Sequence, residues 1–275
     1  MLTVLVVAFG HNEELDASLS GVGHHFPLVV VDNSSLPSIE ASTRSAGGIY
    51  VPRADNAGFA AGVNVGLRHV EAGSDVLLLN PDAVIDAGAV SVLSRRLHSD
   101  PRLAAVAPAL IDHESGARQR VMWPFPTPRR MWGLALGGRR LGGRDEFLVG
   151  AVLLLRREAL DDVGQFDERF FLYAEETDWQ RRAVIRGWKL AVEPAAVATH
   201  VGGATSSDPF IREVRFHAGT ETYIRKWHGS SGWLVYRLAA VVASLLRALP
   251  GHRRDESLRR AGVFVRGPRR LAERL

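Results

Sequence analysis

The chain has 275 residues, of which 46% are hydrophobic and 23% charged, a composition typical of a globular protein with a sizeable core. It contains no cysteine, which excludes disulfide bonds and thiolate metal sites and leaves oxygen and imidazole as ligands for any metal ion. The formal net charge is +4, but residues 251–275 hold eight arginines against three acidic residues, a net of +5, so the other 250 residues sum to −1. The basic charge therefore belongs to a tail, which argues against a nucleic-acid-binding globular domain.

The first 110 residues alternate short apolar runs with helical patterns. Residues 1–9 are apolar, lack a preceding basic region and are soon followed by acidic residues, so we predict a first strand and not a signal peptide. Continuous apolar runs separated by helices indicate a parallel sheet covered on both faces. The predicted strands are 2–9, 28–31, 49–51, 76–79 and 104–107, and the predicted helices are 13–21, 36–46, 59–71 and 87–98.

Residues 112–146 interrupt this alternation, because glycine, arginine and proline are dense there and no periodicity is visible. We predict a long mobile loop, and long loops in compact domains often carry function. The predicted elements that follow are a strand at 147–155, a helix at 175–186, a strand at 188–192 and a helix at 208–227.

Residues 233–249 form a strongly apolar predicted helix on which Arg237, Ser244 and Arg247 make one polar stripe. The uncharged run between the two arginines is nine residues long, whereas a bilayer span takes about 20. An apolar helix before an arginine-rich tail is typical of a membrane-surface anchor, so residues 233–275 are a candidate for peripheral membrane contact. The alternative is that the helix packs on the domain or on a second copy in a homodimer, and both stay open.

Residues 165–183 place acidic residues among large aromatic side chains. Burying an ionised carboxylate is costly unless it is paired or bound to a cation, so this mixture is unusual. A solvated helix start explains the acids in part, because Thr177 and Asp178 suit a helix N-terminus. It does not explain the adjoining rings, and we therefore treat the stretch as a candidate site. Its four carboxylates and five rings are Asp167, Glu175, Glu176, Asp178, Phe166, Phe170, Phe171, Tyr173 and Trp179.

Polar residues follow several predicted strands, and open parallel sheets bind ligands just beyond the carboxyl ends of their strands. Asp82 follows the strand at 76–79 and is either part of an ordinary Asn-Pro-Asp turn or an oxygen ligand for Mg²⁺ or Mn²⁺. His200 is either a second metal ligand or a structural histidine. Asp32 either contacts a nucleotide or caps the following helix.

Gly58, Gly62 and Gly66 recur every four residues, which places them on one face of a helix. Their missing side chains allow the backbone to approach either a neighbouring element or a phosphate group. Neither the dinucleotide-binding glycine motif nor the P-loop motif occurs in the chain, so those two nucleotide-binding classes lose their main support.

Four motifs stand in order along the chain: Val30–Ser34, Asn56–Gly66, Leu78–Asp82 and Arg156–Asp178, with His200 downstream. In combination they resemble glycosyltransferase family 2 with a GT-A fold, especially its bacterial rhamnosyltransferase-like branch. The resemblance covers about residues 2–228. It implies an α/β, Rossmann-like, mostly parallel sheet with helices on both faces, and a C-terminal helical appendage. The implied domains are 1–228, with a nucleotide-sugar-binding half 1–110 and an acceptor-binding, catalytic half 111–228 that includes loop 112–146, and a helical basic tail 229–275.

The resemblance implies a role for each matching residue. The metal-binding Asp-x-Asp motif of such enzymes stands here as Asn80-Pro-Asp82, so Asp82 is the acidic ligand and His200 matches the downstream histidine. The usual base is the aspartate of a Glu-Asp pair, whereas this chain has Glu175-Glu176, which assigns the base to Glu176 with Asp178 next. Asp32 matches the acid that contacts the donor's pyrimidine ring. The implied donor-binding residues are Ala8, Asp32, Asn56, Gly58, Phe59, Asn64, Asn80 and Asp82, and the implied acceptor-binding residues are Trp123, Tyr173 and Trp179.

The implied reaction is an inverting, metal-assisted transfer of a hexose from a dTDP- or UDP-sugar to a hydroxyl of a glycan or lipid-linked acceptor, in synthesis of a cell-envelope polysaccharide. The implied location is the cytoplasm, at the inner face of the plasma membrane. Two alternatives stay open. One is a non-catalytic sugar-nucleotide-binding module, which the Glu175-Glu176 pair and the single acid of the metal motif favour. The other is a nucleotidyltransferase, although its glycine-rich basic phosphate loop is missing.

Overall fold

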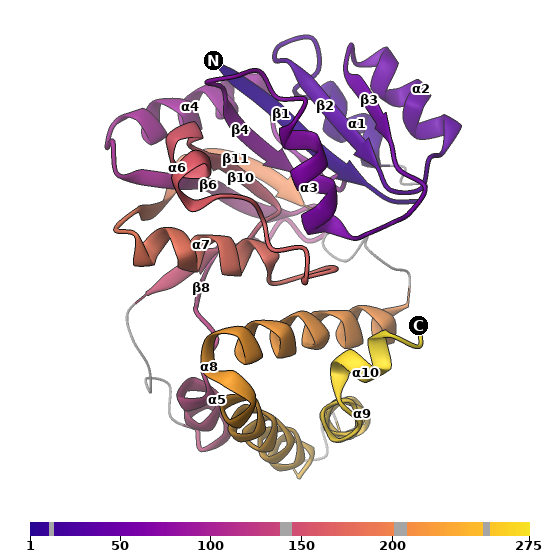
Figure 1. The fold of residues 1–275 in the computed structure, drawn as a ribbon, viewed down its shortest axis with the longest axis vertical. Coiled ribbons are helices and arrows are strands. Elements are labelled where there is room, and N and C mark those ends of the chain that lie inside the picture. Colours follow the sequence, from indigo (N-terminus) through magenta and orange to yellow (C-terminus); the bar gives the residue numbers. More distant parts are fainter. Residues whose placement is uncertain (11–13, 138–144, 201–207, 250–253) are drawn as a thin grey trace. The chain divides into compact units, whose positions relative to one another are not determined.

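The computed structural model describes residues 1–10, 14–137, 145–200, 208–249 and 254–275. The chain forms two compact units, which we describe separately (Figure 1). The boundary predicted at residue 229 falls inside the second unit. The sheet unit comprises Met1–Trp123, Glu146–Phe171 and Glu175–Thr205, and the helical unit comprises Pro124–Asp145, Leu172–Ala174 and Ser206–Leu275.

A nine-stranded sheet is the centre of the sheet unit. Its strands are β1 (Leu2–Ala8), β2 (Leu28–Asp32), β3 (Ile49–Pro52), β4 (Asp75–Leu79), β5 (Ala83–Val84), β6 (Leu103–Asp112), β7 (Arg118–Gln119), β10 (Val152–Leu155) and β11 (Lys189–His200). Their order is β3-β2-β1-β4-β10-β6-β11-β5, with β7 beside β6. The first four are mutually parallel and β11 is parallel to β6, whereas β10 is antiparallel to both its neighbours. The predicted α/β fold is confirmed, but the sheet is mixed and not mostly parallel: four of its eight strand pairings are parallel, and β5, β7 and β10 supply the four antiparallel ones.

The helices of the sheet unit are α1 (Glu14–Ser20), α2 (Pro37–Ser45), α3 (Phe59–Leu67), α4 (Ala87–His98), α6 (Arg157–Val163) and α7 (Glu175–Ile185). The central strands consist of valine, leucine and alanine with almost no exposed surface, because helices cover both faces of the sheet. Burial of these apolar side chains is the main force that holds the sheet together.

The segment predicted as an irregular loop, 112–146, is more regular than expected. It contains β7, β8 (Met122–Pro124) and α5 (Pro128–Ala135), and its residues 138–144 lie outside the described residues. The signal for α5 was present, because Thr127 caps the helix and proline follows at its first position. The strand predicted at 147–155 is two strands, since β9 (Glu146–Leu148) pairs with β8 and only β10 enters the main sheet.

The helical unit consists of α5, α8 (Pro209–Ala248), α9 (Arg254–Arg266) and α10 (Pro268–Ala272). The helices predicted separately at 208–227 and 233–249 are joined in α8, which bends between them at Gly229, whose φ of 69° suits glycine. Figure 1 shows the two halves of α8 diverging from this kink, with α9 between them. Arg237 fixes α9 by donating hydrogen bonds to the carbonyl oxygens of Phe264 (2.6 Å) and Val265 (2.5 Å).

Candidate active site

Strand pairing brings together the two predicted metal ligands, Asp82 and His200. Ala83, at the start of β5, pairs with His200, the last residue of β11. The Asp82 Oδ2 atom therefore lies 3.5 Å from the His200 Nε2 atom, and both side chains are largely buried. Two residues that are 118 positions apart in sequence thus share one edge of the sheet.

The hydrogen bonds of His200 indicate which ring nitrogen carries a proton. The Gln119 amide nitrogen donates to Asp112 and to the His200 carbonyl, both at 3.2 Å, so the Gln119 Oε1 atom is the acceptor that faces His200 Nδ1 at 3.2 Å. The Nδ1 atom therefore donates to Gln119, and the Nε2 atom faces the Asp82 carboxylate. Two acceptors at this distance repel unless a proton or a cation lies between them, so the pair fits a divalent ion. No third His, Cys, Asp or Glu joins them among the described residues.

Asp32 is fully buried and both of its carboxylate oxygens accept hydrogen bonds from the protein. The backbone and hydroxyl of Ser34 donate to Oδ1, and Leu36 N and the Tyr50 hydroxyl donate to Oδ2, at 2.5–2.9 Å. Burial and this hydrogen bond raise the pKa of Tyr50 to about 12. In this structure Asp32 fixes the turn after β2.

The neighbouring Asn33 has a vacant acceptor, a feature that the sequence reasoning missed. Its side chain is 3% exposed, and its Nδ2 atom donates to the Gly58 carbonyl at 3.1 Å. Its Oδ1 atom is buried and has no hydrogen-bond partner among the residues that the structure describes. A buried acceptor left unpaired is costly, so a ligand that donates an N–H there would bind favourably.

The glycine-rich segment that begins at Asn56 contacts the acidic and aromatic residues that follow position 165. Gly58 has φ 92° and ψ 178°, and a Cβ atom added to it would lie 2.2 Å from the Phe171 carbonyl oxygen. The Phe59 N–H donates to that same oxygen at 2.7 Å. Asn56, just before it, also has a positive φ of 33°. Only glycine at position 58 therefore allows this segment to reach residues 165–183, the acidic-aromatic stretch.

The remaining glycines of α3 pack on the sheet. A Cβ atom on Gly62 would lie 2.6 Å from Val7, and one on Gly66 would lie 2.2 Å from Leu5, so close helix-to-strand packing accounts for both. Asn64, on the same helix, clasps the acidic-aromatic stretch: its amide nitrogen donates to the Phe166 carbonyl and to Glu168, and its oxygen accepts from Phe166 N, each at 2.9 Å. Asn64 therefore holds the stretch against α3.

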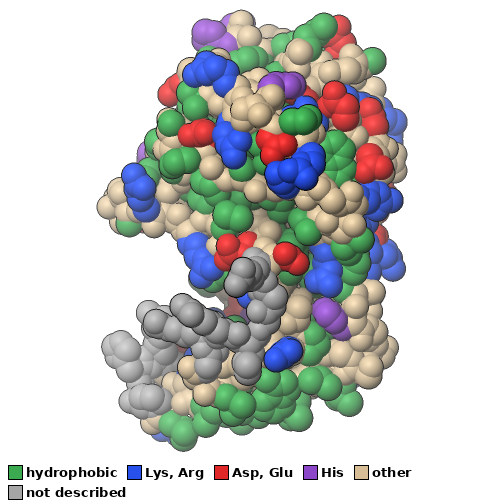
Figure 2. All heavy atoms as spheres, turned by 90° about the vertical axis from the view of Figure 1, so that its left-hand side faces the viewer, with side chains coloured by type: hydrophobic (Ala, Val, Ile, Leu, Met, Phe, Trp, Pro, Cys, Tyr) green, Lys and Arg blue, Asp and Glu red, His purple; other side chains and the backbone are tan. Residues whose placement is uncertain are grey.

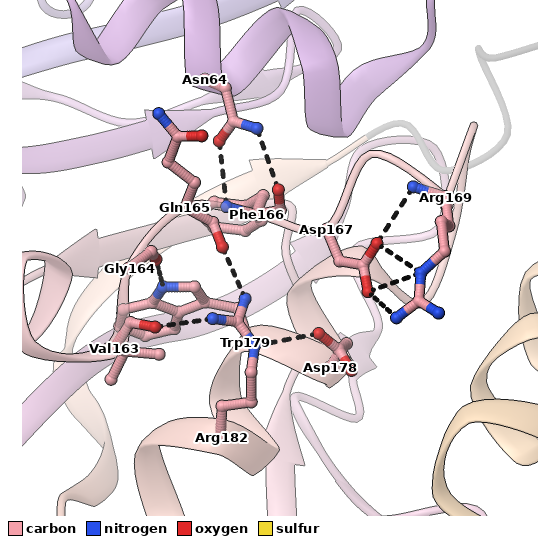
Figure 3. Close-up of polar contacts among 10 residues, drawn as sticks. All are labelled: Asn64, Val163, Gly164, Gln165, Phe166, Asp167, Arg169, Asp178, Trp179 and Arg182. Atoms are coloured by element: carbon pink, nitrogen blue, oxygen red, sulfur yellow. Dashed lines mark hydrogen bonds and ion pairs between the residues drawn. The ribbon is translucent and has the colours of Figure 1, made fainter.

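Two of the predicted site residues on α7 are buried in fixed contacts (Figure 3). Asp178 is 0% exposed and accepts a hydrogen bond from Arg182 at 3.1 Å, and Arg182 also donates to the carbonyl oxygens of Val163 and Gln165. Trp179 is 0% exposed, donates to the Gly164 carbonyl at 3.0 Å and stacks on Phe166. No face of the Trp179 ring is left for an acceptor, so the structure makes it a core residue.

Glu175 and Glu176 begin α7 in different surroundings. Glu175 is 4% exposed, and its Oε2 atom has no hydrogen-bond partner among the described residues. Burial, followed by the charge of Glu176, raises the pKa of Glu175 well above its ordinary value. Burial therefore favours the neutral form of Glu175, so the negative charge of the pair is more stable on Glu176, which is partly exposed.

Gly150 and Gln180 position Glu176, and the sequence reasoning missed both. A Cβ atom on Gly150 would lie 3.0 Å from the Glu176 Cγ atom, so the Glu176 side chain occupies the space that glycine leaves. One turn later, the Gln180 amide binds Leu148 twice, accepting from its N–H and donating to its carbonyl at 2.8 Å. The next residue after Gly150, Ala151, accepts a hydrogen bond from Asn80 N at 2.9 Å. This turn therefore links Glu176 to the loop that carries Asp82.

The other predicted donor and acceptor residues have diverse settings. Ala8 is 2% exposed, and its carbonyl oxygen accepts a hydrogen bond from Asn33 N at 2.9 Å. Trp123 is 45% exposed, with the Arg120 guanidinium 4.3 Å from its ring centroid. Tyr173 belongs to the helical unit, where its ring lies 5.8 Å from that of Phe216. Within the sheet unit, no hydrogen bond or ion pair among the described residues joins Ala8 or Trp123 to the Asp82–His200 pair.

The fold and this arrangement of groups define the class: a GT-A-type α/β transferase with acidic groups and a histidine at the strand ends. A family model described as "Glycosyltransferase like family 2" matches residues 4–217. The chain therefore belongs to this family and is a glycosyltransferase.

Three similar proteins illustrate the relationship. The N-acetylglucosaminyl-diphospho-decaprenol L-rhamnosyltransferase of Mycobacterium tuberculosis (strain ATCC 25618 / H37Rv) is 28% identical, over 85% of this chain and 86% of that protein. The low-salt glycan biosynthesis hexosyltransferase Agl10 of Haloferax volcanii is 26% identical, over 66% of this chain and 61% of that protein. The mannosyltransferase PcManGT of Pyrobaculum calidifontis, solved with GDP-Man and Mn²⁺, superposes with a TM-score of 0.62 and 15% identity, over 96% of this chain and 84% of that one.

Proposed function

We propose that this glycosyltransferase moves a hexose, with rhamnose as the favoured sugar, from a dTDP- or UDP-linked donor to a hydroxyl of a lipid-linked or glycan acceptor, with inversion at the anomeric carbon. The name of the relative from Mycobacterium tuberculosis supports the choice of sugar and of a lipid-linked acceptor. The observation that carries the proposal is the setting of Glu176, a partly exposed carboxylate beside the turn that links it to Asn80.

The proposed chemistry is a single displacement in which Glu176 is the general base. Its carboxylate takes the proton of the acceptor hydroxyl while that oxygen attacks the anomeric carbon from the face opposite the diphosphate. The bond from the anomeric carbon to the diphosphate oxygen breaks, and the nucleoside diphosphate leaves with the electron pair. The raised pKa of Glu175 supports this role, because a neutral neighbour lets Glu176 stay ionised without a second buried charge beside it.

Groups at the strand ends of the sheet unit would bind the donor. Asp82 and His200 would hold Mg²⁺ or Mn²⁺, and the donor diphosphate and water would complete the coordination of the ion. Such an ion offsets the charge that grows on the departing diphosphate. The vacant Asn33 Oδ1 atom would accept the N–H of a uracil or thymine ring, which favours a UDP- or dTDP-sugar.

The second half of α8 supports contact with a membrane surface on the cytoplasmic side. By length and composition α8 could cross a membrane, but 28% of its most apolar stretch is buried inside the protein. One side of its second half packs inward through Ala239, Ala240 and Ala243, and the other side exposes Leu234, Leu238 and Leu245. Figure 2 shows hydrophobic side chains gathered on the helical unit at the bottom of that view. An amphipathic helix of this kind lies along a membrane interface.

Transfer with stereochemical analysis tests the proposal. The protein is incubated with dTDP-rhamnose, or with a panel of UDP-sugars, and a prenyl-diphosphate-linked N-acetylglucosamine acceptor. We expect a glycosylated product whose anomeric configuration, read by proton NMR, is opposite to that of the donor. A product with retained configuration would contradict the mechanism, and donor hydrolysis without transfer to any acceptor would contradict the acceptor class.

The metal assignment has its own test with a matched control. Asp82→Ala should abolish the dependence of donor binding on Mn²⁺ in calorimetric titrations. Asp86→Ala removes another nearby acid, one that caps α4 through Ala89, and should leave that dependence intact. Equal Mn²⁺ dependence in the wild type and in Asp82→Ala would refute the assignment.

A further inference from the structure

The helical unit contains a cavity of about 640 Å³, a volume in the range of small-ligand sites. Residues of both halves of α8, of α9 and of α5 line it, and Tyr173 contributes its ring. The kink at Gly229 directs the two halves of α8 apart, and side chains from both halves and from α9 line the cavity between them. All of the lining residues belong to the helical unit.

The walls of the cavity are apolar and aromatic. Met131 and Leu134 come from α5, Phe216 and Tyr236 come from the two halves of α8, and Phe264 comes from α9. Burial raises the pKa of Tyr236 to about 12, so this hydroxyl stays neutral at physiological pH. These walls suit a hydrocarbon chain, which binds through apolar contact area alone.

The charges that line the cavity favour an anion. Four arginines against two glutamates give the lining a net charge of +2 with histidine neutral. Arg260 is balanced within the protein, because it pairs with Glu213 at 2.5 Å and with Glu256 at 3.0 Å. Arg247 and Arg259 are exposed and make no ion pair with any described residue. Arginine binds phosphate oxygens in pairs, so these two side chains are suited to a phosphate or diphosphate group.

The lining also contains a histidine, His217, with one ring nitrogen that has no hydrogen-bond partner among the described residues. The His217 Nε2 atom faces Glu213 at 3.8 Å, and hydrogen bonding to His217, together with the charge of Arg260, lowers the pKa of Glu213 to about 2. The His217 Nδ1 atom is buried without a hydrogen-bond partner among the described residues. The lining thus offers apolar walls, unpaired cations and one unsatisfied ring nitrogen in a single space.

We propose that this cavity binds the prenyl-diphosphate part of the acceptor, with the diphosphate at Arg247 and Arg259 and the first prenyl units against the apolar walls. The inference rests on the proposed function, because it assigns a site to the lipid carrier of that acceptor. The exposed leucines lie on the opposite side of the same half of α8 that lines the cavity, so this helix can face both the bound diphosphate end and a membrane that holds the rest of a long prenyl chain.

Calorimetric titration of the full-length protein with farnesyl diphosphate tests this assignment. Saturating UDP or dTDP with Mn²⁺ is present throughout, so that the probe cannot bind through its diphosphate at the donor site. We expect farnesyl diphosphate to bind, and farnesol, inorganic diphosphate and vesicles of phosphatidylglycerol to compete with it poorly. Binding of farnesol or inorganic diphosphate as tight as that of farnesyl diphosphate would overturn the combined site. Equal competition by the vesicles would show a general lipid surface and would also overturn it.

Charge-reversal variants provide the matched control. Arg247→Glu with Arg259→Glu should weaken farnesyl diphosphate binding by about tenfold or more and raise the KM for a prenyl-linked acceptor without lowering kcat. Arg266→Glu with Arg270→Glu changes the same charge at exposed positions away from the lining and should alter neither value by more than about twofold. Equal effects of the two double variants would overturn the proposal. Donor binding and donor hydrolysis are measured separately, so a failure of the proposed function would appear there and not in the farnesyl diphosphate titration.

Discussion

The sheet unit and the helical unit differ in how far their polar side chains are buried and bonded within the protein. In the sheet unit, Asp32 and Asn64 are buried and held by several bonds each: Asp32 accepts four hydrogen bonds and Asn64 makes three. In the helical unit, Arg247 and Arg259 are exposed without an ion pair to any described residue, and large leucines face solvent. The sheet unit thus holds these side chains in buried, fixed positions, whereas the helical unit presents exposed cations and apolar side chains to the solvent.

This difference matches the demands of two kinds of ligand. A reaction at one carbon atom needs groups fixed to within a fraction of an ångström, and a rigid scaffold supplies them at low cost when the ligand binds. A long flexible amphiphile needs apolar area and an anion site, and it tolerates a less exact surface. The predictions below follow from this contrast, and they run from the largest expected effect to the smallest.

The backbone of Gly58 lies very close to the Phe171 carbonyl group, and a side chain added at Gly58 should cause the largest loss of stability among these variants. Gly58→Ala should destabilise the protein by about 4 kcal/mol, because the backbone conformation is nearly restricted to glycine and the new Cβ would collide with the Phe171 carbonyl. Gly73→Ala is the control, since Gly73 also has a positive φ, of 81°, but has open space around it; we expect a loss of about 1 kcal/mol. Urea unfolding measures both, and equal losses would mean that the close approach contributes nothing.

The Gln180 clamp, which is the pair of hydrogen bonds between the Gln180 amide and Leu148, should contribute to both the free energy of unfolding and kcat. Gln180→Leu leaves the N–H and carbonyl of Leu148 unpaired, so we expect a loss of about 2 kcal/mol and a lower kcat with unchanged donor affinity, because Glu176 lies one turn away on α7. Arg186→Leu, at an exposed position just past α7, is the control and should change neither. A normal kcat in a folded Gln180→Leu variant would show that the clamp does not position Glu176.

The buried carboxyl of Glu175 should make stability depend on pH in a defined direction. Its pKa is raised in the folded state above the ordinary value of 4.5, so its favourable contribution is complete below that pH and is lost as the pH rises through the folded pKa. Glu175→Gln cannot ionise and should melt at a higher temperature than the wild type at pH 8. The two melting curves should converge towards pH 4.5, and a difference independent of pH would contradict the assignment.

The exposed leucines of α8 should matter for membrane binding and hardly at all for stability. Leu238→Ser with Leu245→Ser should reduce sedimentation with liposomes, while the free energy of unfolding changes by about 0.5 kcal/mol or less, because both side chains are exposed. Ile185→Ser, an exposed apolar position in the sheet unit, should leave sedimentation unchanged. Undiminished sedimentation of the double variant would remove this face from membrane contact.

The contrast also explains how far the sequence could predict the structure. The buried strands and the helix at 175–186 were predictable because their apolar periodicity is a local property of the chain. The Asp82–His200 pair followed from the rule that strand ends meet, although the short strand β5 that joins them was not foreseen. By contrast, the hydrogen bonds between Gln180 and Leu148 depend on contacts between distant segments, and so does the vacant oxygen of Asn33. No local sequence pattern reveals such contacts.

The helical unit was less accessible to such reasoning. The apolar pattern predicted the two halves of α8, but α5 lies in a segment predicted to be irregular. The two halves of α8 are joined by a bend at Gly229, and both of them line the cavity. The arginines of the tail were visible as charge alone. Their division into the paired Arg260 and the unpaired Arg247 and Arg259 depends on where α9 lies against α8.

The most direct test of the account is the turnover of Glu176→Gln, measured together with calorimetric binding of the nucleotide-sugar donor. Glutamine keeps the size of the side chain over Gly150 but cannot accept the acceptor's proton. Glu158→Gln, at an exposed position on α6, is the matched control. The account predicts that kcat falls by about 100- to 10,000-fold in Glu176→Gln alone, with donor affinity unchanged. A kcat close to that of the wild type, with donor binding intact, would contradict it.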